Sequence, residues 1–97
     1  MKKPGNVLEA FEVLDSLFAE PVAKAVFAEI KEAEDMICFH SNLGRAMRND
    51  WGLWQDSDLA TVLREQGLSH ADDMSHAILV SYWQYKHGYK CLIAPED

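Results

Sequence analysis

Residues 70–87, HADDMSHAILVSYWQYKH, carry a long helical pattern that decides the fold of this chain. Two apolar stripes follow helical spacing in this stretch: Met74, Ile78, Ser81, Tyr82 and Tyr85 form one, and Leu79 and Trp83 form the other. Asp72 and Asp73 fall in the first turn, where carboxylates meet the positive end of the helix dipole. A helix that is apolar over so much of its circumference is usually packed on two sides. We therefore predict a central helix that begins at Ser69 or His70 and ends near His87.

Two helices are predicted in the first 40 residues. Asn6 and Glu9 form a capping-box-like start for a helix over residues 7–19, and Pro21 separates this helix from the next. The second helix shows an apolar stripe made of Val22, Val26, Ile30, Ala33 and Ile37. We expect the two helices to pack as a tight antiparallel pair.

A third, short helix is predicted after this pair, over residues 43–49. Ser41 or Asn42 has the right side chain to cap it, because both accept hydrogen bonds from free helical N–H groups. Gly52 is expected to end it.

A fourth helix is predicted to end at Gly67, the residue type that closes helices in a left-handed conformation. Asp56 or Ser57 caps its start. Leu68 should then fold back onto Leu63, as in a Schellman motif. Beyond the central helix, residues 89–93 form either an extended tail or one more helical turn.

The fold class expected from these patterns is all-α, with about five helices. A chain of 97 residues builds one hydrophobic core, so residues 1–97 should form a single small domain. Its two parts are an acidic N-terminal helical hairpin and a C-terminal helical unit around the central helix. Disorder is expected only at the ends, in residues 1–5 and 94–97.

The formal net charge of −7 is concentrated in residues 6–37. This segment contains eight acidic residues and only two basic ones, Lys24 and Lys31. The acidic residues are Glu9, Glu12, Asp15, Glu20, Glu29, Glu32, Glu34 and Asp35. Direct binding to nucleic acid is disfavoured, because counterion release requires a Lys/Arg surface. A basic protein partner fits this charge, and a solvated face that keeps the protein in solution is the plainer alternative.

No stretch of the sequence is apolar for the roughly 18 residues that a membrane span requires. The start of the chain also lacks the apolar segment of a signal peptide, so we expect a cytoplasmic protein that does not bind membranes. Cys38 and Cys91 form no Cys-x-x-Cys motif, and we expect them to remain buried or half-buried thiols.

A basic and aromatic cluster lies in residues 45–54, which include RNDWGLW. Its members are Arg45, Arg48, Trp51 and Trp54. Trp and Arg contribute much of the binding energy at protein interfaces, so this cluster is a candidate recognition surface. The structural alternative places Trp51 in the core and pairs Arg48 with Asp72 or Asp73, which would lock the loop to the central helix.

Metal binding and catalysis have weak candidates. Asp72, Asp73 and His76 lie at helical spacing, but a third ligand would have to come from His40, Cys38, His70 or His87. We favour the interpretation that the two aspartates cap the helix and His76 is solvated. A zinc site made of Cys38, His40, His87 and Cys91 lacks the usual paired spacing. We predict no cofactor and assign no catalytic residue.

The second half of the chain, residues 39–88, resembles a small bacterial family of unknown function with the pattern RNxWGLW followed by HxDDMS. The residues that match are His40, Leu43, Gly44, Arg48, Asn49, the run from Trp51 to Trp54, Leu59, Gly67, Leu68, His70, the run from Asp72 to Ser75, Ile78, Leu79, Ser81 and Tyr82. The chain departs from the pattern at Ala71, where the family tends to have proline. Residues 1–38 lie outside the match. The resemblance implies a shared helical fold and implies no activity.

We predict from these observations a non-enzymatic module that binds a basic protein partner, such as an accessory, immunity-type or inhibitory factor. The candidate binding residues are Glu9, Glu12, Glu29, Glu32, Arg45, Arg48, Trp51 and Trp54. A small metal-dependent hydrolase that uses Asp72, Asp73 and His76 is one alternative. A homo-oligomer that packs through Tyr82, Trp83 and Tyr85 is another.

Overall fold

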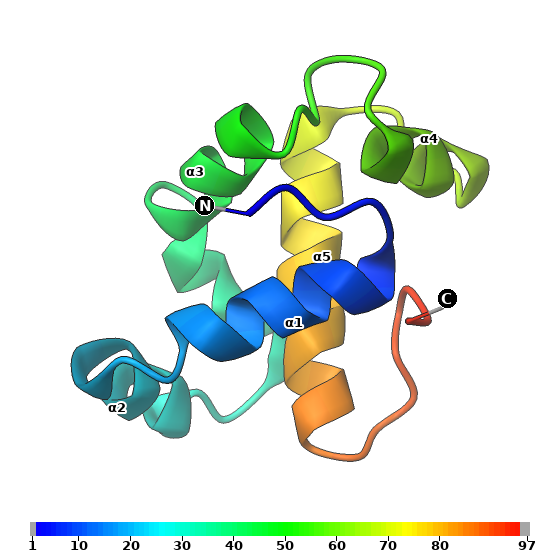
Figure 1. Ribbon diagram of the computed structural model, residues 1–97. Helices are drawn as coiled ribbons and strands as arrows, with labels where there is room; N and C mark the ends of the chain where they lie inside the picture. Colours follow the sequence, from blue (N-terminus) through cyan, green and yellow to red (C-terminus); the bar gives the residue numbers. More distant parts are fainter. Residues whose placement is uncertain (1, 96–97) are drawn as a thin grey trace.

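Helix α5 (Ala71–Lys86) forms the axis of the molecule in the computed structural model, which describes residues 2–95 (Figure 1). Ten of its sixteen residues are buried, and residues 77–83 are buried without a break. No side of that segment therefore faces water. The prediction of a central helix is confirmed, and its start is capped by His70, whose Nδ1 accepts the backbone N–H of Asp72 at 3.1 Å.

The other elements surround this axis. In chain order they are α1 (Val7–Leu17), α2 (Pro21–Glu29), the 3₁₀ helix η1 (Ala33–Phe39), α3 (Leu43–Asp50) and α4 (Asp58–Glu65). Helices α1, η1, α3 and α4 pack directly on α5, and α1 crosses it in Figure 1. The all-α single domain is confirmed, and the described residues 2–95 contain six helices and no strand.

The start of α1 agrees with the predicted capping box. The Asn6 side chain accepts the N–H of Glu9 at 2.9 Å, and Glu9 Oε1 in turn accepts the N–H of Gly5 at 2.8 Å. These two bonds satisfy backbone donors that a helix start leaves free. The helix ends at Leu17, two residues before the predicted end, and buries Phe11 and Leu14 against the core.

The second helix forms after Pro21 as predicted, but its predicted extent to Ile37 is wrong. Helix α2 ends at Glu29, Ile30 is extended, and the chain then forms η1. Val22 is 79% exposed, and Val26 and Ile37 are also exposed, so most of the predicted stripe faces water. The tight hairpin is likewise replaced, because η1 packs on α5 while α2 touches the core mainly through Phe27, whose ring lies 5.0 Å from that of Phe18.

The two short helices form as predicted. Asn42 caps α3, and the Ser57 hydroxyl caps α4 by accepting the N–H of Ala60 at 3.1 Å. Gly67 has a φ of +92°, and the N–H of Leu68 donates to the Leu63 carbonyl at 3.1 Å. This is the bond that defines the predicted Schellman motif.

The segment after α5 is a tail, and it forms no further helical turn. It folds back along α5, where the N–H of Leu92 donates to Gln84 Oε1 at 2.7 Å and the N–H of Ile93 donates to Ser81 Oγ at 2.8 Å. Ile93 is buried, as is Pro4 near the other end. The predicted disorder of residues 1–5 and 94–97 stays a prediction, and residues 1, 96 and 97 lie outside the described part of the chain. Among the described helices, none is long and apolar enough to cross a membrane.

Candidate functional site

Arg48 of α3 lies at the centre of a polar contact between α3 and α5. It is only 7% exposed, and its guanidinium donates from Nη1 to Ser75 Oγ at 2.9 Å and from Nη2 to the His40 carbonyl at 3.2 Å. Its Nε lies 3.2 Å from Asp72 Oδ1. The predicted pairing with Asp72 is therefore present, and the structural alternative for Arg48 is the one observed.

Gly44 leaves the space that Arg48 occupies. A Cβ at this position would lie 3.1 Å from Arg48 Nη1 and 3.2 Å from the Phe39 carbonyl oxygen. Both distances are tighter than ordinary van der Waals contact, so a larger residue would push the guanidinium away from its partners. Gly44, near the start of α3, thus leaves room for the Arg48 guanidinium.

The sequence Trp-Gly-Leu-Trp at residues 51–54 turns the chain out of α3. Trp51 is fully buried, and Leu53 is buried beside it in the core. Gly52 has a φ of +68°, which allows the N–H of Leu53 to donate to the Arg48 carbonyl at 3.1 Å. Trp51 therefore has no exposed side chain to offer a partner, and its predicted role in the core is the one observed.

Trp54 and Arg45 are the exposed members of the cluster. Trp54 is 56% exposed and lies edge-on against His70, with ring centroids 5.7 Å apart. Arg45 is exposed on the outer side of α3. The structure therefore divides the four candidate residues: Arg48 and Trp51 hold the fold together, whereas Arg45 and Trp54 remain available on the surface. His70 beside Trp54 was not among the predicted binding residues.

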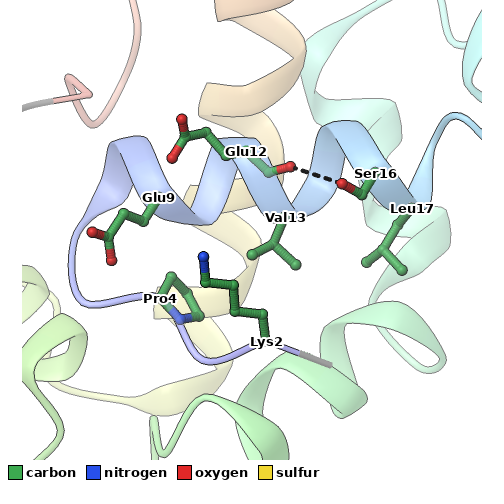
Figure 2. A pocket seen from close by; sticks show the side chains of 7 residues that line it. All are labelled: Lys2, Pro4, Glu9, Glu12, Val13, Ser16 and Leu17. Atoms are coloured by element: carbon green, nitrogen blue, oxygen red, sulfur yellow. Dashed lines mark hydrogen bonds between the residues drawn. The ribbon is translucent and has the colours of Figure 1, made fainter.

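Two of the predicted acidic residues share a groove along α1. Figure 2 shows this groove, which has a volume of about 430 Å³ and is lined by Lys2, Pro4, Glu9, Glu12, Val13, Ser16 and Leu17. Glu9 and Glu12 are exposed, and Val13 and Leu17 are half-buried and packed against the core. The groove thus combines the Glu9 carboxylate with an apolar floor, and Glu12 lines its edge with its carboxylate directed to the other side of α1 in Figure 2. Val13, Ser16 and Leu17 were not among the predicted binding residues, although they follow Glu9 and Glu12 at helical spacing.

The remaining two acidic candidates lie elsewhere. Glu29 is exposed at the end of α2, and Glu32 lines a shallow hollow of about 680 Å³ that also contains Trp83, Tyr89 and Lys90. The Trp83 and Tyr89 rings stack at 5.6 Å there, nearly parallel at 8°. The four glutamates therefore do not form one compact site, although all four are exposed.

A family model for a domain of unknown function, DUF6794, matches residues 3–86. The chain belongs to the DUF6794 family. No curated protein and no solved structure matches it. The match begins at residue 3, well before residue 39 where the resemblance was predicted to start, so the expectation that residues 1–38 lie outside the family is wrong for residues 3–38. The DUF6794 domain includes the acidic helix α1 and helix α2 and ends with α5.

The weak metal candidates of the DUF6794 domain do not converge. Asp72 faces Arg48, Asp73 is exposed and His76 is half-buried. No group of three His, Cys, Asp or Glu side chains within residues 2–95 is placed to hold a metal ion. The arrangement that a hydrolase based on Asp72, Asp73 and His76 would require is therefore not formed by these side chains alone.

The two cysteines are free and differ in exposure. Cys38 is exposed, so the prediction that its apolar neighbours bury it is wrong; Ile37 beside it is exposed as well. Cys91 is half-buried, and burial raises the pKa of its thiol. The imidazole of His87 stacks on Trp83 at 4.0 Å. A raised pKa opposes the thiolate form that a nucleophilic cysteine requires, so Cys91 is a poor candidate for a nucleophile.

Proposed function

We propose that this DUF6794 domain is a non-enzymatic module that binds a basic protein partner through the acidic surface of its N-terminal third. The observation that carries the proposal is the state of the acids in residues 6–37. All eight are exposed, and Asp15 is the one that pairs with a basic residue of the described chain, Lys86, at 3.0 Å. The other seven form no ion pair within residues 2–95, so their charges are available to a partner.

The charges support association in a specific way. Exposed carboxylates attract a basic partner over a range set by the Debye length, about 8 Å in physiological salt. Such attraction raises the rate of encounter and weakens as salt is added. An accessory, immunity-type or inhibitory factor would use this effect to find a basic target quickly.

A variant with Gln at Glu9, Glu12, Glu29 and Glu32 tests the proposal. We expect its melting temperature to stay close to that of the wild type, because all four carboxylates are exposed and none forms an ion pair within the described residues. The capping bond from Gly5 to Glu9 Oε1 can also form with the side-chain oxygen of Gln. A basic partner isolated on the wild-type protein should associate more slowly with the variant and show a weaker dependence on salt. An unchanged association rate at low salt would contradict the proposal and shift attention to Arg45 and Trp54.

The homo-oligomer alternative now rests on different residues. Tyr82 and Trp83 are buried, so two of the three aromatic residues predicted at the interface are unavailable, while Tyr85 is 44% exposed. Val22 and Val26 lie one turn apart on α2 and are both exposed, which gives a second copy an apolar face to cover. Self-association there would bring two acidic surfaces together, so it should strengthen at high salt. Sedimentation equilibrium at low and high salt tests this alternative.

A further inference from the structure

The groove along α1 already holds a cationic side chain of the chain itself. Lys2 comes from the segment that precedes α1 and reaches into the groove, with its ammonium end directed toward the helix (Figure 2). Its aliphatic stem lies on the side of Val13 in this view. A long side chain with an apolar stem and a positive end is therefore what this groove accommodates.

Lys2 lies in the groove without forming an ion pair. Within the described residues, neither Glu9 nor Glu12 forms a salt bridge, and Lys2 is exposed. Exposed lysines that lack a partner at close range keep most of their side-chain freedom and gain little from their position. Another cation can consequently take the place of Lys2 at small cost.

The groove has an acidic subsite, which would bind a cation, and an apolar subsite, and the two lie in a fixed order along α1. Glu9 and Glu12 come first, and Val13 and Leu17 follow toward the C-terminal end of the helix. At 1.5 Å per residue, the centres of the two pairs lie about 7 Å apart along the helix axis. A partner helix presents two side chains at a similar separation when they are four residues apart.

We propose that this groove binds an amphipathic helix of a partner protein, in which a Lys or Arg lies four residues from a Leu, Ile or Val. The cation replaces Lys2 beside Glu9 and Glu12, and the aliphatic side chain packs on Val13 and Leu17. Helix recognition in a groove of this kind relies on such spaced anchors. This inference rests on the proposed function and names the part of the acidic surface that selects the partner.

A 14-residue helical peptide made of leucine and lysine, with Lys and Leu four residues apart, serves as the probe. Titrated into the ¹⁵N-labelled protein, it should shift the amide signals of Val13, Ser16 and Leu17. The same peptide with Glu in place of Lys should produce no shift. If pentylamine alone binds as tightly as the peptide, the groove is a small-amine site and the proposal is overturned.

Matched charge variants separate the groove from general attraction. The variant Glu9→Gln/Glu12→Gln should weaken peptide binding at least fivefold. The variant Glu20→Gln/Glu34→Gln removes the same charge from the start of α2 and from η1, where both residues are exposed, and should weaken binding less than twofold. Equal losses in the two variants would overturn the proposal, because charge alone would then explain the binding.

A second comparison tests the competition by Lys2. The variant Lys2→Gln should bind the peptide more tightly than Lys24→Gln, which removes the same charge from an exposed position on α2. Equal affinities would contradict the displacement of Lys2. If the peptide does not bind the groove but the captured partner still associates more slowly with the variant that lacks the four glutamates, only the groove proposal fails. The failure of the groove and the failure of the proposed function are therefore distinguishable.

Discussion

Replacement of Arg48 by Ala should cause a large loss of stability, because this side chain joins three parts of the molecule. Its guanidinium donates to Ser75 on α5 and to the His40 carbonyl before α3, and pairs with Asp72 in the first turn of α5. Ser75 keeps one bond in the variant, since its hydroxyl donates to the Asp72 carbonyl at 3.1 Å. The His40 carbonyl and the first turn of α5 lose their link to α3.

The magnitude follows from the exposure of each partner. Two hydrogen bonds from a buried charged donor contribute about 1.5 kcal/mol each at the lower end of the usual range. Asp72 is 45% exposed at its side chain, so the ion pair is partly screened by water and adds at most about 1 kcal/mol. We therefore expect Arg48→Ala to lower the free energy of unfolding by about 3 to 4 kcal/mol, a large share of the about 5 to 15 kcal/mol of a typical domain.

Denaturant titration and thermal melting of three variants test this estimate. For a domain of this size, a loss of about 3 kcal/mol should lower the melting temperature by at least about 12 °C. Asp72→Asn should cost only about 1 kcal/mol, because the exposed carboxylate contributes its ion pair and its place near the helix N-terminus. Arg48→Lys should fall between them, since an ammonium lacks the planar fork that reaches three acceptors. If Arg48→Ala costs under about 1 kcal/mol, or no more than Asp72→Asn, the guanidinium is not the link that we describe.

Three further predictions concern the core, the alkaline stability and metal. Ile78→Ala should lower the free energy of unfolding by about 2 to 5 kcal/mol, because Ile78 is fully buried on α5; an unchanged denaturant midpoint would contradict this. Burial, and then the hydrogen bond and negative charge of Asp15, raise the pKa of Tyr82. The phenol of the unfolded chain ionises near pH about 10, so the free energy of unfolding should fall as the pH rises above that value. It should fall less in Tyr82→Phe. Equal slopes of unfolding free energy against pH in the two proteins would argue against the effect. Protein purified without added metal should contain no stoichiometric zinc, manganese or iron, and a melting temperature lowered by a chelator would refute this.

Local signals in the sequence predicted most of the fold because local chemistry decides those features. Asn6 and Ser57 cap helices, and Gly67 ends one, through bonds that span three to five residues. The central position of α5 was also predictable, since its apolar residues cover most of its circumference. None of these features depends on where distant segments lie.

The failure at residues 30–39 has a different physical cause. An apolar stripe with a spacing of 3.6 residues suggested one continuous α-helix, yet the buried residues there are Ala33, Met36 and Phe39, each three apart. That spacing matches the three residues per turn of a 3₁₀ helix, which eclipses side chains at i and i+3. Both patterns were present in the sequence. Packing of η1 on α5 selected the second, and that tertiary contact cannot be read from the local sequence.

The candidate site was predicted only in part for a related reason. Arg48 and its partner Asp72 are 24 residues apart, and a pairing with Asp72 or Asp73 was predictable because a buried arginine requires an acidic partner. The choice between the two aspartates was left open by the sequence. The exposure of Cys38 and Val22 was not predictable, because it depends on which face of a short element meets the core. The rare residues of the RNDWGLW stretch are mostly used to join α3 to α5. The partner recognition that we propose therefore falls to side chains that the fold leaves exposed, and the acidic surface with its groove along α1 is the set to which we assign it.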